Sequence, residues 1–213
     1  MGFQKLQVAA SQYFNQKYGL TYAPSEIIAT VGATEAVATA LLTLLNPGDG
    51  VLLPTPSYTS YAPVVAMAHA TIIPIDTTTS GYKLTPATLL ATIQANAGKR
   101  LKAIILNYPT NPTGVTYSKA ELMALVAVIR QAGLIVISDE IYSEITYDQP
   151  HTALGTLYPE KTITINGFSK SHAMTGWRLG LIMAPQELIN EMKKTHQYLV
   201  TSTSSISQVA GIE

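Results

Sequence analysis

The sequence predicts an α/β fold in which a mostly parallel central sheet carries helices on both faces. Short runs of β-branched residues alternate with longer segments of helical periodicity along most of the 213 residues. Several of these runs are apolar at every position, as is typical of parallel strands covered on both sides. No internal repeat, low-complexity tract or linker interrupts the pattern. We therefore expect one doubly wound domain with right-handed crossovers.

The first half of the chain begins in a helical segment and then alternates strand and helix. Apolar runs predict strands at "IIATV" (27–31), "GVLLP" (50–54) and "TIIPI" (71–75). Helical periodicity lies between them, in "TEAVATALLTLL" (34–45) and from about Tyr58 to His69. The turn "NPGDG" separates the first helix from the second strand. This β, α, β, α, β order favours a parallel sheet.

The second half continues the alternation on the same grounds. Its strands are again short apolar runs, and its helices are longer amphipathic segments. The elements expected, in chain order, are helix 86–97, strand 102–108, helix 118–133, strand 134–138, strand 162–166, strand 179–184 and a helix from Pro185 into the 190s.

Composition excludes several classes of function. Thirteen basic residues balance thirteen acidic ones and are scattered, so we expect neither a nucleic-acid nor a membrane partner. The chain has no cysteine, and its four histidines show no ligand spacing, so no metal site is expected. It shows no signal peptide and no apolar run that could cross a bilayer, which favours a cytoplasmic location. We therefore expect the protein to bind a small-molecule ligand or a protein partner.

Polar residues follow the predicted strands at the positions where a ligand would bind. In open α/β sheets, ligands lie beyond the carboxyl ends of the strands. A small-residue turn opens the first strand-to-helix connection, so its backbone amides could bind an anion. The residues that converge on this edge are Ala33, Thr34, Asn111, Asp139, Tyr142, Ser169 and Lys170, with Arg178 just before the last strand.

This set matches the needs of pyridoxal 5′-phosphate. Lys170 can attach the cofactor covalently, and the Asp139 carboxylate can keep its ring nitrogen protonated. Asn111 and Tyr142 can face the ring hydroxyl, and the planar fork of Arg178 suits a phosphate.

Each residue taken alone also has a simpler interpretation. Lys170 could be a solvated surface lysine, and Asp139 could cap a helix or form half of an ion pair. Tyr58 and Tyr142 could be amphipathic residues at a rim. "GATEA" and "NPTG" could be ordinary turns. The functional interpretation therefore depends on the whole set of residues.

Five motifs carry a resemblance that covers nearly the whole chain. "VGATEA", "PSY", "YPTNPTG", "SDEIYSEITYD" and "GFSKSHAMTGWRLG" occur in the order found in one family. The chain resembles the fold-type I, pyridoxal-phosphate-dependent aminotransferases of class I/II. Within that family its motifs are similar to those of bacterial N-acetyl-diaminopimelate and aromatic-amino-acid aminotransferases.

The resemblance implies a role for each matching position. Lys170 matches the catalytic lysine that holds the cofactor, and Asp139 matches the partner of the ring nitrogen. The other cofactor contacts it implies are Asn111 and Tyr142 at the ring hydroxyl, Tyr58 stacked on the ring, and Ala33, Thr34, Ser169 and Arg178 at the phosphate. Many relatives have a serine three residues before the lysine, whereas this chain has Gly167.

The resemblance also implies a larger protein. Residues 1–213 would form the cofactor-binding large domain, with an N-terminal segment and a C-terminal small domain outside them. The arginine that binds the substrate carboxylate in the family belongs to that C-terminal part. The family is usually homodimeric, so we expect a homodimer of the full-length protein.

The implied reaction transfers an amino group from an L-amino acid to a 2-oxo acid by a ping-pong mechanism. Two alternatives remain at this point. The same cofactor chemistry serves β-lyases, and residues 1–213 alone could be a cofactor-binding fragment without activity.

Overall fold

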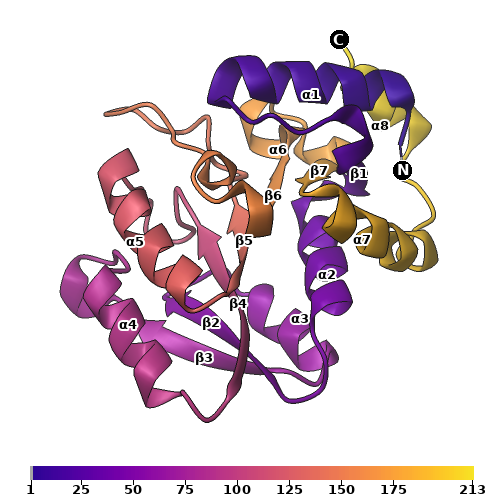
Figure 1. Cartoon of the computed structure of the whole chain (residues 1–213). Helices are drawn as coiled ribbons and strands as arrows, with labels where there is room; N and C mark the ends of the chain where they lie inside the picture. The colour runs from indigo at the N-terminus through magenta and orange to yellow at the C-terminus, as the bar shows by residue number, and fades with distance from the viewer. Residues whose placement is uncertain (1) are drawn as a thin grey trace.

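The computed structural model describes residues 2–213, which form one seven-stranded sheet with helices on both faces (Figure 1). The strand order is β1-β7-β6-β5-β4-β2-β3. The strands are β1 (Ile27–Val31), β2 (Asp49–Thr55), β3 (Thr71–Asp76), β4 (Arg100–Asn107), β5 (Ile135–Asp139), β6 (Thr162–Gly167) and β7 (Leu179–Met183). The helices are α1 (Gln4–Tyr18), α2 (Gly32–Leu44), α3 (Tyr61–Met67), α4 (Pro86–Ala95), α5 (Lys119–Gln131), α6 (Phe168–Ser171), α7 (Gln186–Leu199) and α8 (Ser205–Ala210).

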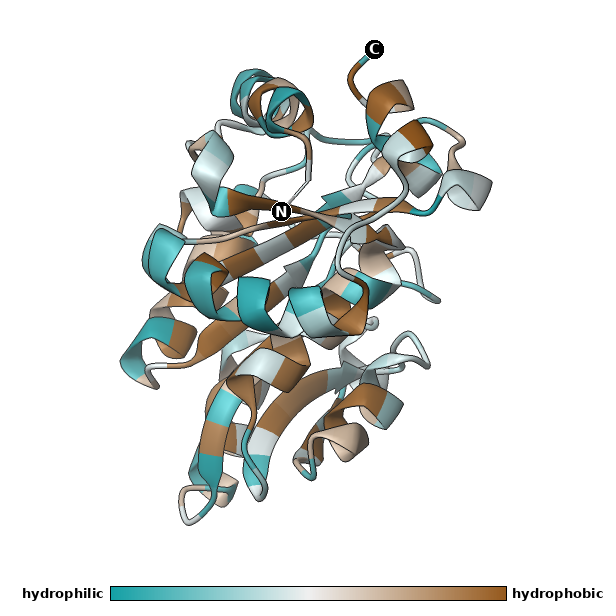
Figure 2. Cartoon of the chain, turned by 90° about the vertical axis from the view of Figure 1, so that its right-hand side faces the viewer, coloured by the Kyte–Doolittle hydropathy of each residue, from teal (hydrophilic) through white to brown (hydrophobic). Residues whose placement is uncertain are grey.

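Two layers of helices cover the sheet. Alternate residues along the strands pack against α2, α3 and α7 on one face, in a core that includes Ile28, Ile137 and Ile182. The intervening residues pack against α4 and α5 on the other face, and α1 covers β1 and β7 on that same face. The strands between the layers are mainly hydrophobic (Figure 2). The predicted α/β class with helices on both faces is confirmed.

Local sequence explains where several helices begin and end. The Ser118 hydroxyl accepts from the Glu121 amide, and the Glu121 carboxylate accepts from the Ser118 amide, which starts α5 with a reciprocal cap. Gly19, in the left-handed region at φ 71°, ends α1. The helix predicted from about Tyr58 begins instead at Tyr61, because residues 58–61 form a turn in which the Tyr61 amide donates to the Tyr58 carbonyl.

The strand β7 is antiparallel to both of its neighbours, β6 and β1, while the remaining pairs are parallel. Only residues 168–178 separate β6 from β7. A segment of this length is too short for the usual crossover between parallel strands, so the chain turns back along β6. As a consequence, β7 begins at the edge of the sheet where β6 ends.

Candidate active site

The carboxyl ends of β1, β2, β4, β5 and β6 meet the start of β7 at one edge of the sheet. Asn107 pairs with Asp139 across β4 and β5. Gly167 pairs with Gly180 across β6 and β7, and Val31 pairs with Leu179 across β1 and β7. Residues that follow five different strands therefore come together with the residue that precedes β7.

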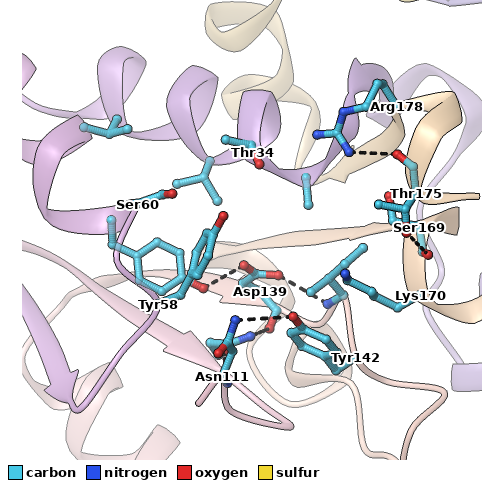
Figure 3. A pocket seen from close by; sticks show the side chains of 16 residues that line it. Thr34, Tyr58, Ser60, Asn111, Asp139, Tyr142, Ser169, Lys170, Thr175 and Arg178 are labelled. Atoms are coloured by element: carbon cyan, nitrogen blue, oxygen red, sulfur yellow. Dashed lines mark hydrogen bonds between the residues drawn. The ribbon is translucent and has the colours of Figure 1, made fainter.

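A pocket of about 330 Å³ opens at this edge, and all of the predicted site residues line it (Figure 3). The lining also contains residues that sequence reasoning did not select, which are Val37, Ser60, Tyr61, Val64, Asn107, Ile141 and Thr175. Two groups of residues form opposite ends of the pocket. We call them the carboxylate end (Asp139, Tyr61, Asn107, Asn111 and Tyr142) and the arginine end (Ala33, Thr34, Ser169 and Arg178).

Asp139 is the last residue of β5 and forms the centre of the carboxylate end. Its side chain is buried. The Tyr61 hydroxyl donates to Oδ2 at 2.7 Å, and the Ile141 amide donates to Oδ1 at 3.2 Å. Burial raises the pKa of Asp139 to about 6, although both hydrogen bonds oppose the rise. The carboxylate is therefore poorly solvated and would be stabilised by a further donor, above all a cationic one.

Tyr61 supports this carboxylate and was missed by the sequence analysis. It is fully buried in α3, and burial raises the pKa of its hydroxyl well above the usual value. The Tyr58 ring, in the turn before the helix, meets the Tyr61 ring edge to face, with centroids 5.6 Å apart. The spacing of three residues between two tyrosines at a helix start was the available signal.

Two asparagines connect Asp139 to Tyr142. Asn107 Nδ2 donates to the Asp139 carbonyl at 2.9 Å, and Asn107 Oδ1 accepts from the Asn111 amide at 2.8 Å. Asn111 Nδ2 in turn donates to the Tyr142 hydroxyl at 3.4 Å. Burial raises the pKa of Tyr142. Asn107 was also missed, although a polar residue that ends the apolar run "KAIILNY" was the sequence signal.

Lys170 lies in the single turn of α6, directly after β6. Its Nζ is 5.8 Å from the centroid of the Tyr142 ring. Within residues 2–213 this amine forms no salt bridge. An amine that is not held by a carboxylate in a pocket beside Tyr142 and Asp139 is suited to covalent chemistry.

The arginine end is shaped by backbone rather than by buried side chains. Arg178 has left-handed backbone geometry, and its Nη1 donates to the Thr175 carbonyl at 3.1 Å. Its guanidinium lies over Gly32, where a Cβ would be only 2.5 Å from Nη2. The helix α2 begins at this glycine, so the guanidinium and the first amides of the helix face the same part of the pocket.

Two further glycines allow this close approach. A Cβ at Gly180 would lie 2.4 Å from the Gly32 carbonyl carbon and 2.7 Å from the Ala33 amide nitrogen. A Cβ at Gly167 would lie 2.8 Å from the Leu179 carbonyl oxygen. A side chain in place of Gly167 would therefore collide with the backbone of β7.

No group of three or more histidine, cysteine, aspartate or glutamate side chains able to hold a metal ion occurs within residues 2–213. No helix in the same part of the chain is long and apolar enough to span a membrane.

Comparison with known proteins identifies the family. The model of the family described as "Aminotransferase class I and II" matches residues 1–212. The chain belongs to this family. Its members depend on pyridoxal phosphate.

Several aminotransferases are similar to this chain across its whole length. A probable N-acetyl-LL-diaminopimelate aminotransferase of Bacillus subtilis is 44% identical over 213 residues, which are 100% of this chain and 53% of the relative. An aspartate aminotransferase of Geobacillus stearothermophilus is 38% identical over 216 residues, which are 99% of this chain and 54% of the relative. The chain thus spans about half the length of the curated aminotransferases that it matches.

Solved structures of aminotransferases share the fold. The aspartate aminotransferase of Thermus thermophilus with maleate superposes with a TM-score of 0.94 at 34% identity, over 99% of this chain and 55% of that one. The N-succinyldiaminopimelate aminotransferase of Mycobacterium tuberculosis gives a TM-score of 0.93 at 36% identity, over 99% and 56%. At these identities and scores, the comparison supports both the family and the fold.

Proposed function

We propose that the full-length protein is a pyridoxal-phosphate-dependent aminotransferase that moves an amino group from an L-amino acid to a 2-oxo acid by a ping-pong mechanism. Residues 1–213 would be its cofactor-binding large domain. The observation that carries the proposal is one pocket with three complementary parts. These are the Lys170 amine, which forms no salt bridge within residues 2–213, the buried Asp139 carboxylate, and an anion site formed by Arg178 and the start of α2.

The residues present fit the cofactor. Asp139 would accept from the ring nitrogen and keep it protonated, because a buried carboxylate is stabilised by a cationic donor. Asn111 and Tyr142 would contact the ring hydroxyl, and Tyr58 would stack on the ring. When bound, pyridoxal phosphate supplies an electron sink for the substrate α-carbon.

The phosphate would bind at the arginine end. The guanidinium of Arg178 gives it a planar pair of donors, and the amides of Ala33 and Thr34 add the positive end of α2. Ser169, which is 7% exposed, lies in the same lining and offers a hydroxyl. The absence of a side chain on Gly32 leaves room for the guanidinium.

Lys170 would have two roles. Its Nζ would hold the cofactor covalently at rest. Once the substrate amine has displaced it, the free amine would move the proton to and from the substrate α-carbon. A single lysine can do both because it stays tethered beside the reacting atoms.

The first experiment locates the covalent attachment. The chain is incubated with pyridoxal phosphate, reduced with borohydride and digested, and mass spectrometry identifies the modified lysine. We expect modification at Lys170, its loss in Lys170→Ala, and no change in Lys161→Ala, which removes a lysine at the opposite end of β6. A label that persists at the same level in Lys170→Ala would overturn the assignment.

The substrate class is tested with the full-length protein. The relatives named above act on different amino donors, so a panel of acidic, aromatic and diaminopimelate-type donors with 2-oxoglutarate is the suitable assay. Transfer of the amino group supports the proposal. Release of ammonia without an acceptor would show an elimination reaction instead.

We also propose a cytoplasmic homodimer for the full-length protein. Trp177 and Ile206 expose apolar surface beside Arg178, at 45% and 72% of their areas. Light scattering after gel filtration would test the dimer, and a monomer at micromolar concentration would contradict it.

A further inference from the structure

The helix α7 packs against α2, the helix whose first turn lines the arginine end of the pocket (Figure 1). His196 lies at this contact and is fully buried. Its Nδ1 is 3.1 Å from Glu35 Oε1. Its Nε2 is buried without a hydrogen-bond partner among residues 2–213. The polar contact of this imidazole is therefore made to Glu35.

Glu35 directly follows Thr34 in the first turn of α2. Its Oε2 accepts from the Val31 amide at 3.1 Å, and the Thr39 hydroxyl donates to Oε1. Because a carboxylate only accepts, His196 Nδ1 is the donor in its contact with Glu35. Val31 is the last residue of β1 and precedes Gly32, which has a φ of 71°. Glu35 thus holds the turn from which the first amides of α2 project.

Neither Glu35 nor His196 lines the pocket. The Glu35 carboxylate is directed to the turn and to α7. This placement matters because a carboxylate facing the arginine end would repel a bound phosphate.

An imidazole with one unsatisfied nitrogen is an unfavourable residue for a fully buried position. Burial of an unpaired polar atom destabilises the folded state, whereas leucine would fill similar space without this penalty. A histidine at this position therefore indicates a role that a leucine could not perform. The polar contact that a leucine could not make is the hydrogen bond to Glu35.

We propose that His196 and Glu35 are positioning residues for the phosphate of pyridoxal phosphate. They act through Val31 and Gly32, which they hold so that the amides of Ala33 and Thr34 face Arg178. This inference rests on the proposed function, because it concerns the same cofactor. It adds that α7, which does not line the pocket, helps to set the affinity for the phosphate.

The test compares two ligands that differ only in the phosphate, pyridoxal 5′-phosphate and pyridoxal. Their dissociation constants are measured by absorbance titration of the chain. In His196→Leu we expect affinity for pyridoxal phosphate to fall on the order of tenfold, the equivalent of one lost charge-assisted hydrogen bond. Affinity for pyridoxal should stay within about twofold, because the carboxylate end is unchanged.

Two variants control for damage to the helix contact. His196→Asn places an amide nitrogen near the position of Nδ1, so it should restore much of the affinity for pyridoxal phosphate. Thr195→Val removes the hydrogen bond between Thr195 and Thr43, which joins the same two helices at 2.8 Å without touching Glu35. It should leave the ratio of the two affinities unchanged. An equal loss for both ligands in His196→Leu, or the same ratio change in Thr195→Val, would overturn the proposal.

Hydrogen exchange of the cofactor-free chain tests the same idea without any ligand. The peptide that spans residues 31–35 should exchange faster in His196→Leu than in Thr195→Val, and equal protection would contradict the positioning role. The two proposals can fail separately. Absence of label at Lys170 in the unmodified chain counts against the function, whereas normal labelling with an unchanged affinity ratio in His196→Leu counts against this inference alone.

Discussion

The two ends of the pocket are built in different ways. At the carboxylate end, buried side chains hold one another by hydrogen bonds, as the Tyr61 hydroxyl holds Asp139. At the arginine end, glycines let the backbone of α2 approach β7 and let the guanidinium of Arg178 lie on the chain. The geometry of the carboxylate end depends on which polar side chains are present. The geometry of the arginine end depends on glycines, whose lack of a side chain leaves room for close contacts.

This difference predicts different sensitivities to mutation. Removal of one hydroxyl at the carboxylate end leaves its geometry and changes its electrostatics, so effects should be graded. Addition of one methyl group at Gly180, which packs against the start of α2, meets the backbone of Gly32 and Ala33; backbone cannot rotate out of the way, so the effect should be large. The predictions below test this contrast, beginning with the largest expected effect.

Gly180→Ala should be the most damaging small substitution. The new Cβ would lie 2.4 Å from the Gly32 carbonyl carbon, so α2 must move away from β7. We expect a loss of about 3 kcal/mol in the free energy of unfolding, measured by urea denaturation. Binding of pyridoxal phosphate should weaken more than binding of pyridoxal, because the displaced amides belong to the arginine end.

The control is Gly176→Ala, in the 3₁₀ turn η5 (Thr175–Trp177) just before Arg178. A Cβ at Gly176 would meet nothing within 4 Å. We expect its stability to stay within about 0.5 kcal/mol of the unmodified chain. Equal stability of the two variants would refute the close-packing explanation.

Asp139, Lys170 and Asn111 could be predicted because ligands bind beyond the carboxyl ends of the strands in open α/β sheets. To apply this rule, it is enough to find the polar residues that follow each apolar run in the sequence. It did not select Tyr61, because that residue belongs to a helix and reaches Asp139 only after α3 has packed on the sheet. The antiparallel direction of β7 was likewise not predicted, because the composition of an apolar run does not indicate whether the strand is parallel or antiparallel to its neighbours.

Contacts between distant elements were also beyond sequence reasoning. His196 and Glu35 are 161 positions apart, and nothing in either local segment indicates the other. The role of Gly180 depends on the approach of α2 to β7, which only the packed structure defines.

Tyr61→Phe should have an intermediate effect through the pKa of Asp139. Burial holds that pKa at about 6, and the hydrogen bond from Tyr61 lowers it. Loss of the hydroxyl should therefore raise the pKa of Asp139 above about 6. Carbon-13 NMR of the aspartate carboxyl groups in the cofactor-free chain measures this shift, with Asp139→Asn assigning the signal.

The same substitution should alter how stability depends on pH. The folded chain keeps a proton on Asp139 up to a pH of about 6, whereas the ordinary pKa of aspartate is 3.8. Between these values the folded state binds more protons, so this group makes stability fall as pH rises. In Tyr61→Phe that fall should extend to higher pH. Tyr158→Phe, a buried tyrosine on the opposite face of the sheet, should leave the profile unchanged.

Tyr142→Phe should have the smallest effect and should define the outer limit of the carboxylate end. The Tyr142 hydroxyl is 3.4 Å from Asn111 Nδ2 in a half-buried position, so its loss should change the free energy of unfolding by less than about 0.5 kcal/mol. A lost contact to the cofactor ring should weaken pyridoxal phosphate and pyridoxal by the same factor, about threefold. Tyr147→Phe, on the same loop and 89% exposed, should change neither affinity. A loss confined to the phosphorylated ligand would instead assign Tyr142 to the arginine end.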